Sequence, residues 1–258
     1  MKIVAINGSP KGKDGNTNVM VDAFLKGAQE AGAKTVNVFL AEKEINHCRG
    51  CHSCWFNTPG ECIFKDDMTE ILSLGQETDV LVLATPLKYA NMSSILKVFI
   101  DRLIVLCNPY FEKNAQGTRH PKKTAAAETQ SSFYRSKLVM IASGALGTRY
   151  HFQVISHWIK KLAFYNHTDV IGEIYAPQGS LLTTQEAQLR PIIDNYLQLL
   201  EKAGMEIATI SRLTEETTKS LAQNFIPDAI YIEQVNNFFD SLLSKLDHPY
   251  LKKQTKFI

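Results

Sequence analysis

Residues 2–18 decide the fold, and they read KIVAINGSPKGKDGNTN. Residues 3–6 form a short apolar run, which is typical of a strand buried on both faces. The next four residues, 7–10, are all turn formers. Apolar residues then recur at helical spacing over 19–28. The sequence therefore predicts a strand, a polar loop and a helix in direct succession.

A loop of this kind directs free backbone N–H groups and the positive end of the helix dipole toward one point. We interpret it as a phosphate-binding loop. The side chains that could donate to the phosphate are Ser9, Asn16, Thr17 and Asn18, with Lys11 as a cation. Neither the Walker A pattern nor the dinucleotide fingerprint Gly-x-Gly-x-x-Gly occurs here. The pattern favours a mononucleotide with one terminal phosphate, and an ordinary strand-to-helix turn is the alternative.

Composition limits the classes of function. The chain has 258 residues, of which 45% are hydrophobic, so it can bury a core without disulfides. Its net charge of +2 does not favour nucleic acid or an anionic membrane as a partner. The start at Met1 does not resemble a signal peptide, and no apolar run is long enough to cross a bilayer. We expect a cytoplasmic protein with neither a nucleic-acid nor a membrane partner.

Four more apolar runs predict strands, and helical patterns separate them. The strands are expected at 35–40, 79–86, 137–143 and 169–175, with helices near 66–75, 93–106, 153–164 and 183–200. This alternation predicts an α/β fold with a doubly wound parallel sheet of five strands, order 2-1-3-4-5, and helices on both faces. We assign 1–205 to this domain and 211–258 to a helical C-terminal extension.

Helix starts and one insertion can also be located. Asp67 with Glu70, and Thr183 with Glu186, have the spacing of capping boxes. Pro191 follows the second pair, so that helix either kinks or begins near Arg190. Residues 108–136 are polar and interrupted, which predicts an insertion that forms a solvated surface loop, with a lid or a dimer arm as alternatives.

Ligands of an open parallel sheet bind beyond the carboxyl ends of the strands, where the winding reverses. Three predicted loops meet there, at 8–17, 86–92 and 143–147. The first suits a phosphate, the second offers Tyr89 and backbone amides to a flat ring, and the third is glycine-rich and permits close approach. Together they favour a flat heteroaromatic monophosphate such as FMN, and three ordinary loops are the alternative.

The sequence resembles the NADPH-dependent FMN reductase and iron–sulfur flavoprotein group of the flavodoxin-like fold. The segments that carry this resemblance are GSPK at 8–11, GNT at 15–17, CRGCHSC at 48–54, GEC at 60–62, KDDM at 65–68, TPLKY at 85–89 and LKVFIDR at 96–102. The resemblance is good from Met1 to about Gly147, weaker to Gly204, and absent beyond that residue.

The resemblance implies where FMN would lie. Its phosphate would be held by Ser9, Lys11, Asn16, Thr17 and Asn18. The isoalloxazine and ribityl chain would lie beside Pro86, Leu87, Lys88, Tyr89, Ala90 and Asn91, with Ser143, Gly144 and Gly147 behind them. No side chain is expected to act as a catalytic acid or base, because the flavin carries the chemistry. Similar proteins often have Val-Tyr where this chain has Leu87-Lys88-Tyr89, so Lys88 departs from the pattern of the family. A cation at this position would raise the reduction potential of the flavin.

We expect an FMN-dependent NAD(P)H oxidoreductase that passes electrons from reduced nicotinamide through flavin to a small acceptor. The acceptor could be a quinone, a flavin, a nitro or azo compound, or an iron–sulfur partner. One alternative is a non-enzymatic flavin electron carrier or redox sensor that uses the cysteine loop, and another is a flavin-free nucleotide-binding domain. The resemblance also implies a homodimer or homotetramer.

Four of the five cysteines lie close together in the sequence. Two residues separate Cys48 from Cys51 and Cys51 from Cys54, and Cys62 follows after seven more. Thiolates at such spacing can converge on one metal site. The resemblance implies a [4Fe–4S] cluster that exchanges electrons with FMN. A zinc site, and a reduced or partly disulfide-linked loop near the flavin that shapes the substrate pocket, are the alternatives.

Overall fold

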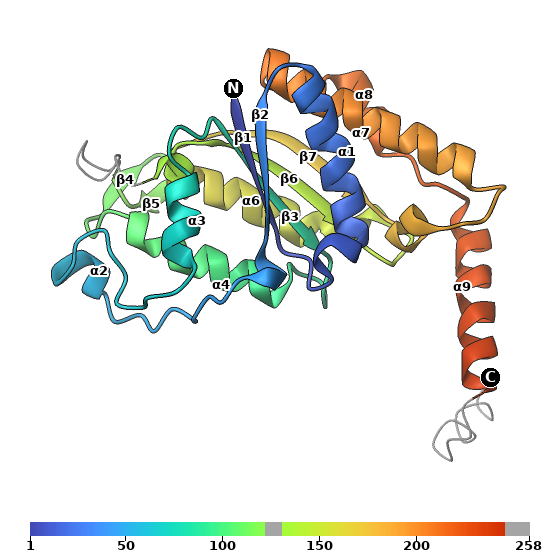
Figure 1. The fold of residues 1–258 in the computed structure, drawn as a ribbon, viewed down its shortest axis with the longest axis horizontal. Coiled ribbons are helices and arrows are strands. Elements are labelled where there is room, and N and C mark those ends of the chain that lie inside the picture. The colour runs from blue at the N-terminus through green and yellow to red at the C-terminus, as the bar shows by residue number, and fades with distance from the viewer. Residues whose placement is uncertain (122–130, 246–258) are drawn as a thin grey trace.

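The protein is described by a computed structural model over residues 1–121 and 131–245. Its centre is a five-stranded sheet in the order β2-β1-β3-β6-β7, and all neighbouring strands are parallel (Figure 1). The strands are β1 Lys2–Asn7, β2 Lys34–Phe39, β3 Val80–Pro86, β6 Lys137–Ser143 and β7 Val170–Ala176. Counted within the sheet, this order is 2-1-3-4-5, so the predicted topology is confirmed.

Helices cover both faces of the sheet, as predicted. One face carries α1 Asn16–Glu30, α7 Arg190–Ile210 and α8 Glu215–Leu221. The other carries α3 Met68–Leu74, α4 Ser94–Arg102 and α6 Gln153–Asn166. Two further helices lie outside these layers: the short α2 Ser53–Phe56 and the long α9 Asp228–Leu243, which projects from the body (Figure 1).

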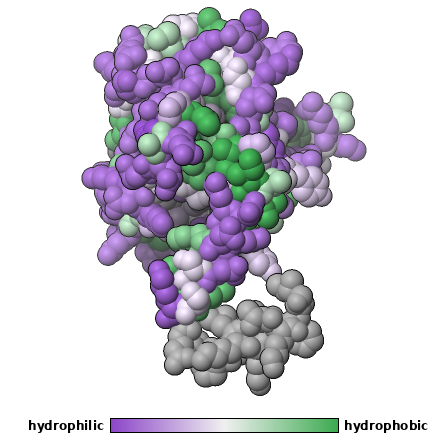
Figure 2. All heavy atoms as spheres, turned by 90° about the vertical axis from the view of Figure 1, so that its right-hand side faces the viewer, coloured by the Kyte–Doolittle hydropathy of each residue, from purple (hydrophilic) through white to green (hydrophobic). Residues whose placement is uncertain are grey.

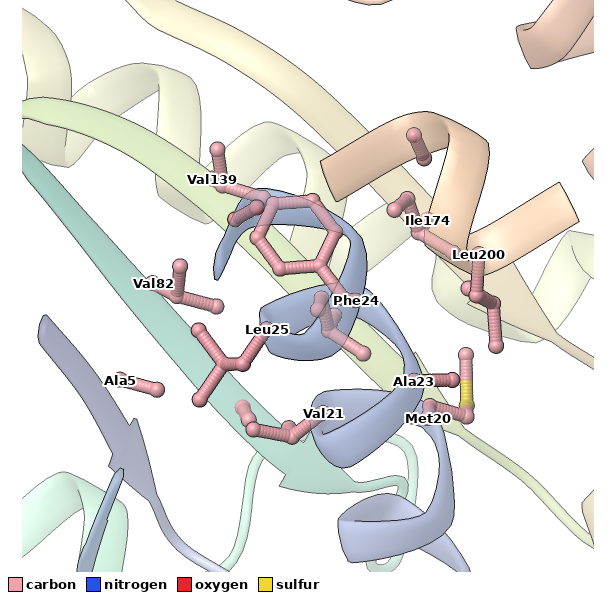
Figure 3. Close-up of a cluster of buried hydrophobic side chains, with 14 of the residues drawn as sticks. Ala5, Met20, Val21, Ala23, Phe24, Leu25, Val82, Val139, Ile174 and Leu200 are labelled. Atoms are coloured by element: carbon pink, nitrogen blue, oxygen red, sulfur yellow. The ribbon is translucent and has the colours of Figure 1, made fainter. Parts of the chain in front are cut away.

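The first strand shows why its residues are apolar throughout. Side chains alternate across a strand, so Ile3 and Ala5 enter the core beneath α1, while Val4 and Ile6 enter the core on the opposite face. All four are fully buried. In the first core, Phe24 of α1 lies beside residues of the central strands (Figure 3). Burial on both faces therefore accounts for the continuous apolar run.

Helices α1 and α7 approach each other so closely that glycine is required at both contact points. A Cβ atom on Gly27 would lie 1.8 Å from the carbonyl oxygen of Glu201, and one on Gly204 would lie 1.8 Å from the carbonyl oxygen of Phe24. Real side chains do not tolerate such distances, so the two backbones are in direct contact. This contact fixes α1, whose N-terminus reaches the candidate site.

Neither predicted capping box forms. Helix α3 has no side-chain cap, because the Asp67 carboxylate accepts a hydrogen bond from the backbone N–H of Glu44 instead. Thr183 ends a 3-10 turn, and the next helix, α7, begins only at Arg190 with Pro191 in its first turn. Proline is well suited to that position, since its missing N–H would have no helical partner there.

The described residues of the predicted insertion form regular structure and core contacts. Strands β4 Glu112–Asn114 and β5 Gly117–Arg119 form an antiparallel hairpin. Phe133 and Tyr134, in a 3-10 turn at Ser132–Tyr134, are buried in the core. The prediction of a solvated loop is therefore wrong for these parts, because apolar side chains pack inward. Residues 122–130 lie outside the described residues, and the lid and dimer-arm alternatives stay predictions.

Among residues 211–245, the structure has two helices, α8 and α9. Helix α8 packs on the core through Thr217 and Leu221, whereas α9 buries only Tyr231 among its described residues. The large apolar side chains that α9 exposes are Ile230, Ile232, Phe238, Phe239, Leu242 and Leu243. Figure 2 shows hydrophobic atoms on the side of the molecule from which α9 projects.

The boundary predicted near residue 205 falls inside α7, which continues to Ile210. A separate extension at 211–258 remains a prediction, and 246–258 lie outside the described residues. Within 1–121 and 131–245, none of the helices has the length and apolar character needed to traverse a lipid bilayer.

Candidate functional site

A cavity of about 280 Å³ lies at the carboxyl ends of the central strands. All three loops predicted to meet there contribute to it. The predicted residues that line it are Ser9, Lys11, Asn16, Thr17, Pro86, Leu87, Lys88, Ser143 and Gly144. Pro10, Gly15, Ala145, Gly179 and Ser180 also line it. The sheet topology therefore gathers residues that are separated by as many as 171 positions.

The N-terminus of α1 opens into this cavity. Its N-cap, Gly15, makes no side-chain cap, and the first turn of the helix contains no acidic residue. The loop before it is held in place by its own hydrogen bonds: the Asn7 side-chain oxygen accepts from the Ser9 N–H at 3.0 Å, and the Ser9 hydroxyl accepts from the Lys11 N–H at 3.3 Å. An uncapped helix start with hydroxyl groups beside it is suited to an anion.

Two hydrogen bonds tie this helix start to loops on other strands. The hydroxyl groups of Thr17 and Ser143 lie 2.9 Å apart and are buried. The Asn16 side-chain oxygen accepts a hydrogen bond from the Thr183 hydroxyl at 3.1 Å. The first loop, the end of β6 and the turn after β7 are therefore joined around one cavity.

Glycine keeps the cavity walls close together. A Cβ on Gly15 would lie 2.3 Å from the Ser9 hydroxyl oxygen, and one on Gly179 would lie 3.0 Å from the Ser143 Cβ. The sequence analysis missed Gly179 and its neighbour Ser180. They could have been found from their position, because they follow the fifth predicted strand and must lie at the same edge of a parallel sheet.

Residues 88–91 form a tight turn at the edge of the cavity. Lys88 and Asn91 exchange two backbone hydrogen bonds, of 2.7 and 2.9 Å, and the residues between them have positive φ angles, 42° at Tyr89 and 66° at Ala90. This is a type I′ turn built without glycine, which costs roughly 1 kcal/mol or more per residue in strain. Strain of this size is typical of functional segments.

The predicted ring contacts beyond Lys88 do not line the first cavity. The Tyr89 side chain is fully exposed at the tip of the turn. Asn91 instead lines a second cavity of about 510 Å³. Its other lining residues are Pro10, Lys88, Met92, Ser93, Ser94 and Lys97. Because Pro10 and Lys88 line both cavities, the two are adjacent and Lys88 lies between them.

Two other predicted residues also lie outside the first cavity. The Asn18 amide makes hydrogen bonds to Asn7, Asn37, Asp22 and the Lys13 carbonyl, at 2.8–3.2 Å. Its side chain therefore holds the loop together and does not face a ligand. Gly147 lies against α9, where its carbonyl accepts a hydrogen bond from Asn224 and a Cβ would meet Asp228.

The cysteine segment, residues 48–62, lies at one end of α4, and the loops that line the first cavity lie at the other. At the start of α4, the Ser93 hydroxyl donates to the Gly8 carbonyl oxygen. At its end, Arg102 donates to Asp66 at 2.6 Å and to the Asn46 carbonyl at 2.9 Å. Nine helical residues, about 13 Å of rise, separate the two ends. The cysteine segment is therefore separated from the first cavity by the length of α4, and the alternative of a loop that shapes the substrate pocket stays a prediction.

The Cys54 thiol lies close enough to the other three thiols of this segment to interact with them electrostatically. Cys48 and Cys51 are exposed, and all four are free. The pKa of Cys54 is raised by burial and then by the nearby thiols of Cys62, Cys48 and Cys51. Among the residues that the structure describes, no three His, Cys, Asp or Glu side chains surround a point that could hold one metal ion. The zinc site and the iron–sulfur cluster therefore both stay predictions.

Curated relatives share part of this chain. An iron-sulfur flavoprotein from Archaeoglobus fulgidus is 42% identical over 104 residues, which are 40% of this chain and 46% of that protein. An iron-sulfur flavoprotein from Methanosarcina thermophila is 34% identical over 118 residues, 45% of this chain and 60% of that protein. The matched region spans about half the length of these relatives.

Solved structures show the same fold. An FMN-dependent NADH-azoreductase from Bacillus anthracis in complex with FMN has a TM-score of 0.56 at 16% identity, covering 81% of this chain and 99% of that one. An NAD(P)H:quinone oxidoreductase from Methanothermobacter marburgensis has a TM-score of 0.56 at 13% identity, covering 80% and 96%.

The family model described as NADPH-dependent FMN reductase matches residues 1–179. This range contains the uncapped α1, the strained turn and the end of β6, so every wall of the cavity except Ser180 lies within the match. The match confirms the predicted family and its cofactor, FMN. The chain belongs to the NADPH-dependent FMN reductase family.

Proposed function

We propose that this chain binds FMN in the cavity at the carboxyl ends of β1, β3 and β6, and that it uses NAD(P)H to reduce a small acceptor. The observation that carries the proposal is the uncapped N-terminus of α1 inside a hydroxyl-lined cavity at the reversal point of the sheet. Quinones and azo compounds are the acceptor classes proposed first, because proteins of the same fold carry those names.

The residues around the α1 N-terminus fit a phosphate group. Ser9 and Thr17 offer hydroxyl groups, Asn16 and Thr17 offer backbone N–H groups of the first turn, and Lys11 adds an exposed cation at the mouth. We assign the phosphate to these residues. Asn18 is left out of the proposed contacts, because its amide is used within the loop.

The remaining walls fit a flat ring. Pro86, Leu87, Ser143, Gly144 and Gly179 form these walls, and a Cβ on Gly144 would lie 3.5 Å from the Leu87 Cβ. When bound, FMN would supply hydride acceptance from reduced nicotinamide and electron delivery to the acceptor. The only titratable side chains lining this cavity are Lys11 and Lys88, so the protein would orient the ring and tune its charge rather than transfer protons.

We assign the adjacent second cavity to the nicotinamide or the acceptor. The strained turn separates it from the flavin cavity, and Tyr89 and Ala90 at the tip of that turn would form its rim. The predicted position of Gly147 behind the flavin ring remains a proposal, because Gly147 does not line the cavity and contacts α9.

Titration of the apo-protein with FMN, followed by steady-state oxidation of NADH and NADPH with a quinone or an azo dye, tests the activity. We expect stoichiometric FMN binding and acceptor-dependent nucleotide oxidation. An electron carrier or redox sensor would bind FMN but oxidise the nucleotides negligibly, and a flavin-free domain would not bind FMN at all.

A second proposal concerns the cysteine segment: Cys48, Cys51, Cys54 and Cys62 hold an iron–sulfur cluster. The neighbouring thiols and the names of the curated relatives support it. Four cysteine thiols are the usual donor set of such a cluster, and Arg102 lies beside Cys62. Anaerobic purification followed by iron and sulfide assays tests it. Cys54→Ser should lose the iron and Cys107→Ser should keep it, whereas an iron-free anaerobic sample would refute it.

The state of the protein in the cell is also a proposal. We expect a homodimer or homotetramer in the cytoplasm, acting on small molecules. Light scattering of the purified holoprotein measures the oligomeric state, and a monomer at all concentrations would contradict that part.

A further inference from the structure

A second ligand site is suggested by an apolar cavity of about 540 Å³ that shares no lining residue with the flavin cavity. It lies between the end of α4, the β4–β5 hairpin and α6. Its walls are mainly large apolar side chains, among them Ile100, Leu103, Ile104, Leu106, Phe111 and Leu162. Cavities of this size and lining, with few polar groups, are typical of sites for small organic molecules.

Two polar side chains of the wall, Arg119 and Tyr134, make hydrogen bonds within the protein. Arg119 donates to the Glu112 carboxylate at 2.9 Å and to the Phe164 carbonyl at 3.3 Å. The Tyr134 hydroxyl donates to the Tyr165 carbonyl at 3.1 Å. Because Glu112 balances the charge of Arg119, the cavity does not select strongly for an anion.

His120 presents a ring nitrogen without a partner among the described residues. Its Nδ1 lies 3.1 Å from the carbonyl oxygen of Tyr110. A carbonyl oxygen only accepts, so Nδ1 must carry the hydrogen, and the neutral ring then presents a lone pair at Nε2. Within the described part of the chain, Nε2 has no hydrogen-bond partner. The ring is held between Trp55 and Phe111, with centroid distances of 5.7 and 5.1 Å, so this acceptor is fixed in place.

We propose that this cavity binds a flat, uncharged aromatic molecule that carries a hydroxyl group and donates its O–H to Nε2 of His120. The apolar walls would bury the ring, and the His120 acceptor, held by its stacked neighbours, would set its orientation.

The cavity wall also contains a reporter. The Trp55 Nε1–H donates to the carbonyl of Ile104, a lining residue, at 3.2 Å, and the indole contacts His120. The chain has two tryptophans, so Trp158→Phe assigns the Trp55 indole signal in a ¹H–¹⁵N spectrum. A molecule bound against His120 should shift that signal.

The test is a titration of 2-naphthol into FMN-saturated, oxidised protein, followed by calorimetry and by the Trp55 signal. We expect saturable binding that shifts this signal and leaves the flavin absorption unchanged. His120→Phe keeps the stacked ring but removes the acceptor, and it should weaken binding about fivefold. Leu162→Trp fills the cavity and should weaken binding at least tenfold. Val154→Trp, on the exposed side of the same helix, should change nothing.

Several results would overturn the proposal. These are no saturable binding, equal binding by wild type and Leu162→Trp, or binding that perturbs the flavin spectrum instead of Trp55. A change of oligomeric state in Leu162→Trp would also refute it, because it would show that a second copy of the chain occupies the cavity. Thermal melting checks that each variant folds, and if Leu162→Trp does not fold, unchanged affinity in His120→Phe refutes the proposal.

Discussion

The hydroxyl of Thr17 lies 2.9 Å from the hydroxyl of Ser143, although 126 residues separate them in the chain. Thr17 is in the first turn of α1, and Ser143 is the last residue of β6. Both side chains are buried and both line the flavin cavity. One hydrogen bond therefore holds the proposed phosphate end of the cavity against the wall behind the ring.

Replacing Thr17 by Val keeps the shape of the side chain and removes its hydroxyl. The Ser143 hydroxyl then loses its partner, so the free energy of unfolding of the apo-protein should fall by about 1–2 kcal/mol. FMN should also bind roughly tenfold more weakly, because a donor to the phosphate is lost. Urea unfolding and FMN fluorescence quenching measure the two effects.

Ser143→Ala is the matched control for that variant. It breaks the same hydrogen bond but leaves the Thr17 hydroxyl beside the phosphate. The two variants should be equally unstable without FMN, while Ser143→Ala should bind FMN more tightly than Thr17→Val. Equal FMN affinities would show that Thr17 has only a structural role.

Lys88 lines both adjacent cavities and is the cation proposed to lie closest to the flavin ring. A positive charge there would stabilise the negative charge that reduction adds to the ring. Lys88→Ala should therefore lower the flavin midpoint potential, on the order of 10–30 mV. Lys88→Arg keeps the charge and should leave the potential close to that of the wild type. Spectroelectrochemistry of the holoprotein decides, and an unchanged potential in Lys88→Ala would remove this role.

The Asp66–Arg102 ion pair predicts a loss of stability in acid. Both side chains are at most 3% exposed. Burial alone would raise the pKa of Asp66, but hydrogen bonds from Arg102 and Asn46 outweigh it and lower the pKa from 3.8 to about 2. Because the folded pKa is below the unfolded one, this stabilisation is complete above about pH 4 and is lost as the pH falls toward 2. Its size is about 2 kcal/mol.

Asp66→Asn tests this assignment through urea unfolding between pH 2 and pH 7. The variant should be less stable at pH 7 by about 3–5 kcal/mol, because Arg102 stays buried without its counter-ion. Its stability should also depend less on pH in the acid range. Asp101→Asn breaks an exposed ion pair with Lys97 and should cost less than about 1 kcal/mol. Similar losses in the two variants would argue against a special role for the buried pair.

The contact between α1 and α7 predicts an unusual effect of alanine. Alanine is a better helix former than glycine by about 1 kcal/mol, yet Gly204→Ala would place a methyl group 1.8 Å from the Phe24 carbonyl oxygen. We expect a net destabilisation of about 1–3 kcal/mol. Thr209→Ala, on the exposed side of the same helix, should stay within about 0.5 kcal/mol. A more stable Gly204→Ala would show that the helices can separate at little cost.

Much of the architecture follows from the sequence. The apolar runs, such as residues 3–6 and 80–84, are buried on both faces, so their position and parallel order could be predicted from the alternation with helices. The same alternation places loops 8–17, 86–88 and 143–144 at one edge of the sheet, which is why most of the predicted phosphate and ring contacts line one cavity. These features depend on local pattern and on the handedness of the connections.

Only the tertiary structure decided the features that depend on competition between partners. Asp67 has the spacing of a cap but bonds Glu44, and Asn18 lies beside the phosphate loop but bonds Asn37 of β2. Spacing along the chain gives no information about these contacts, because the partners come from other segments. The sequence alone therefore determined the doubly wound α/β sheet with a flavin site at its edge. Only the fold decided that the cysteine segment is separated from the cavity by the length of α4, because that separation depends on contacts between distant segments.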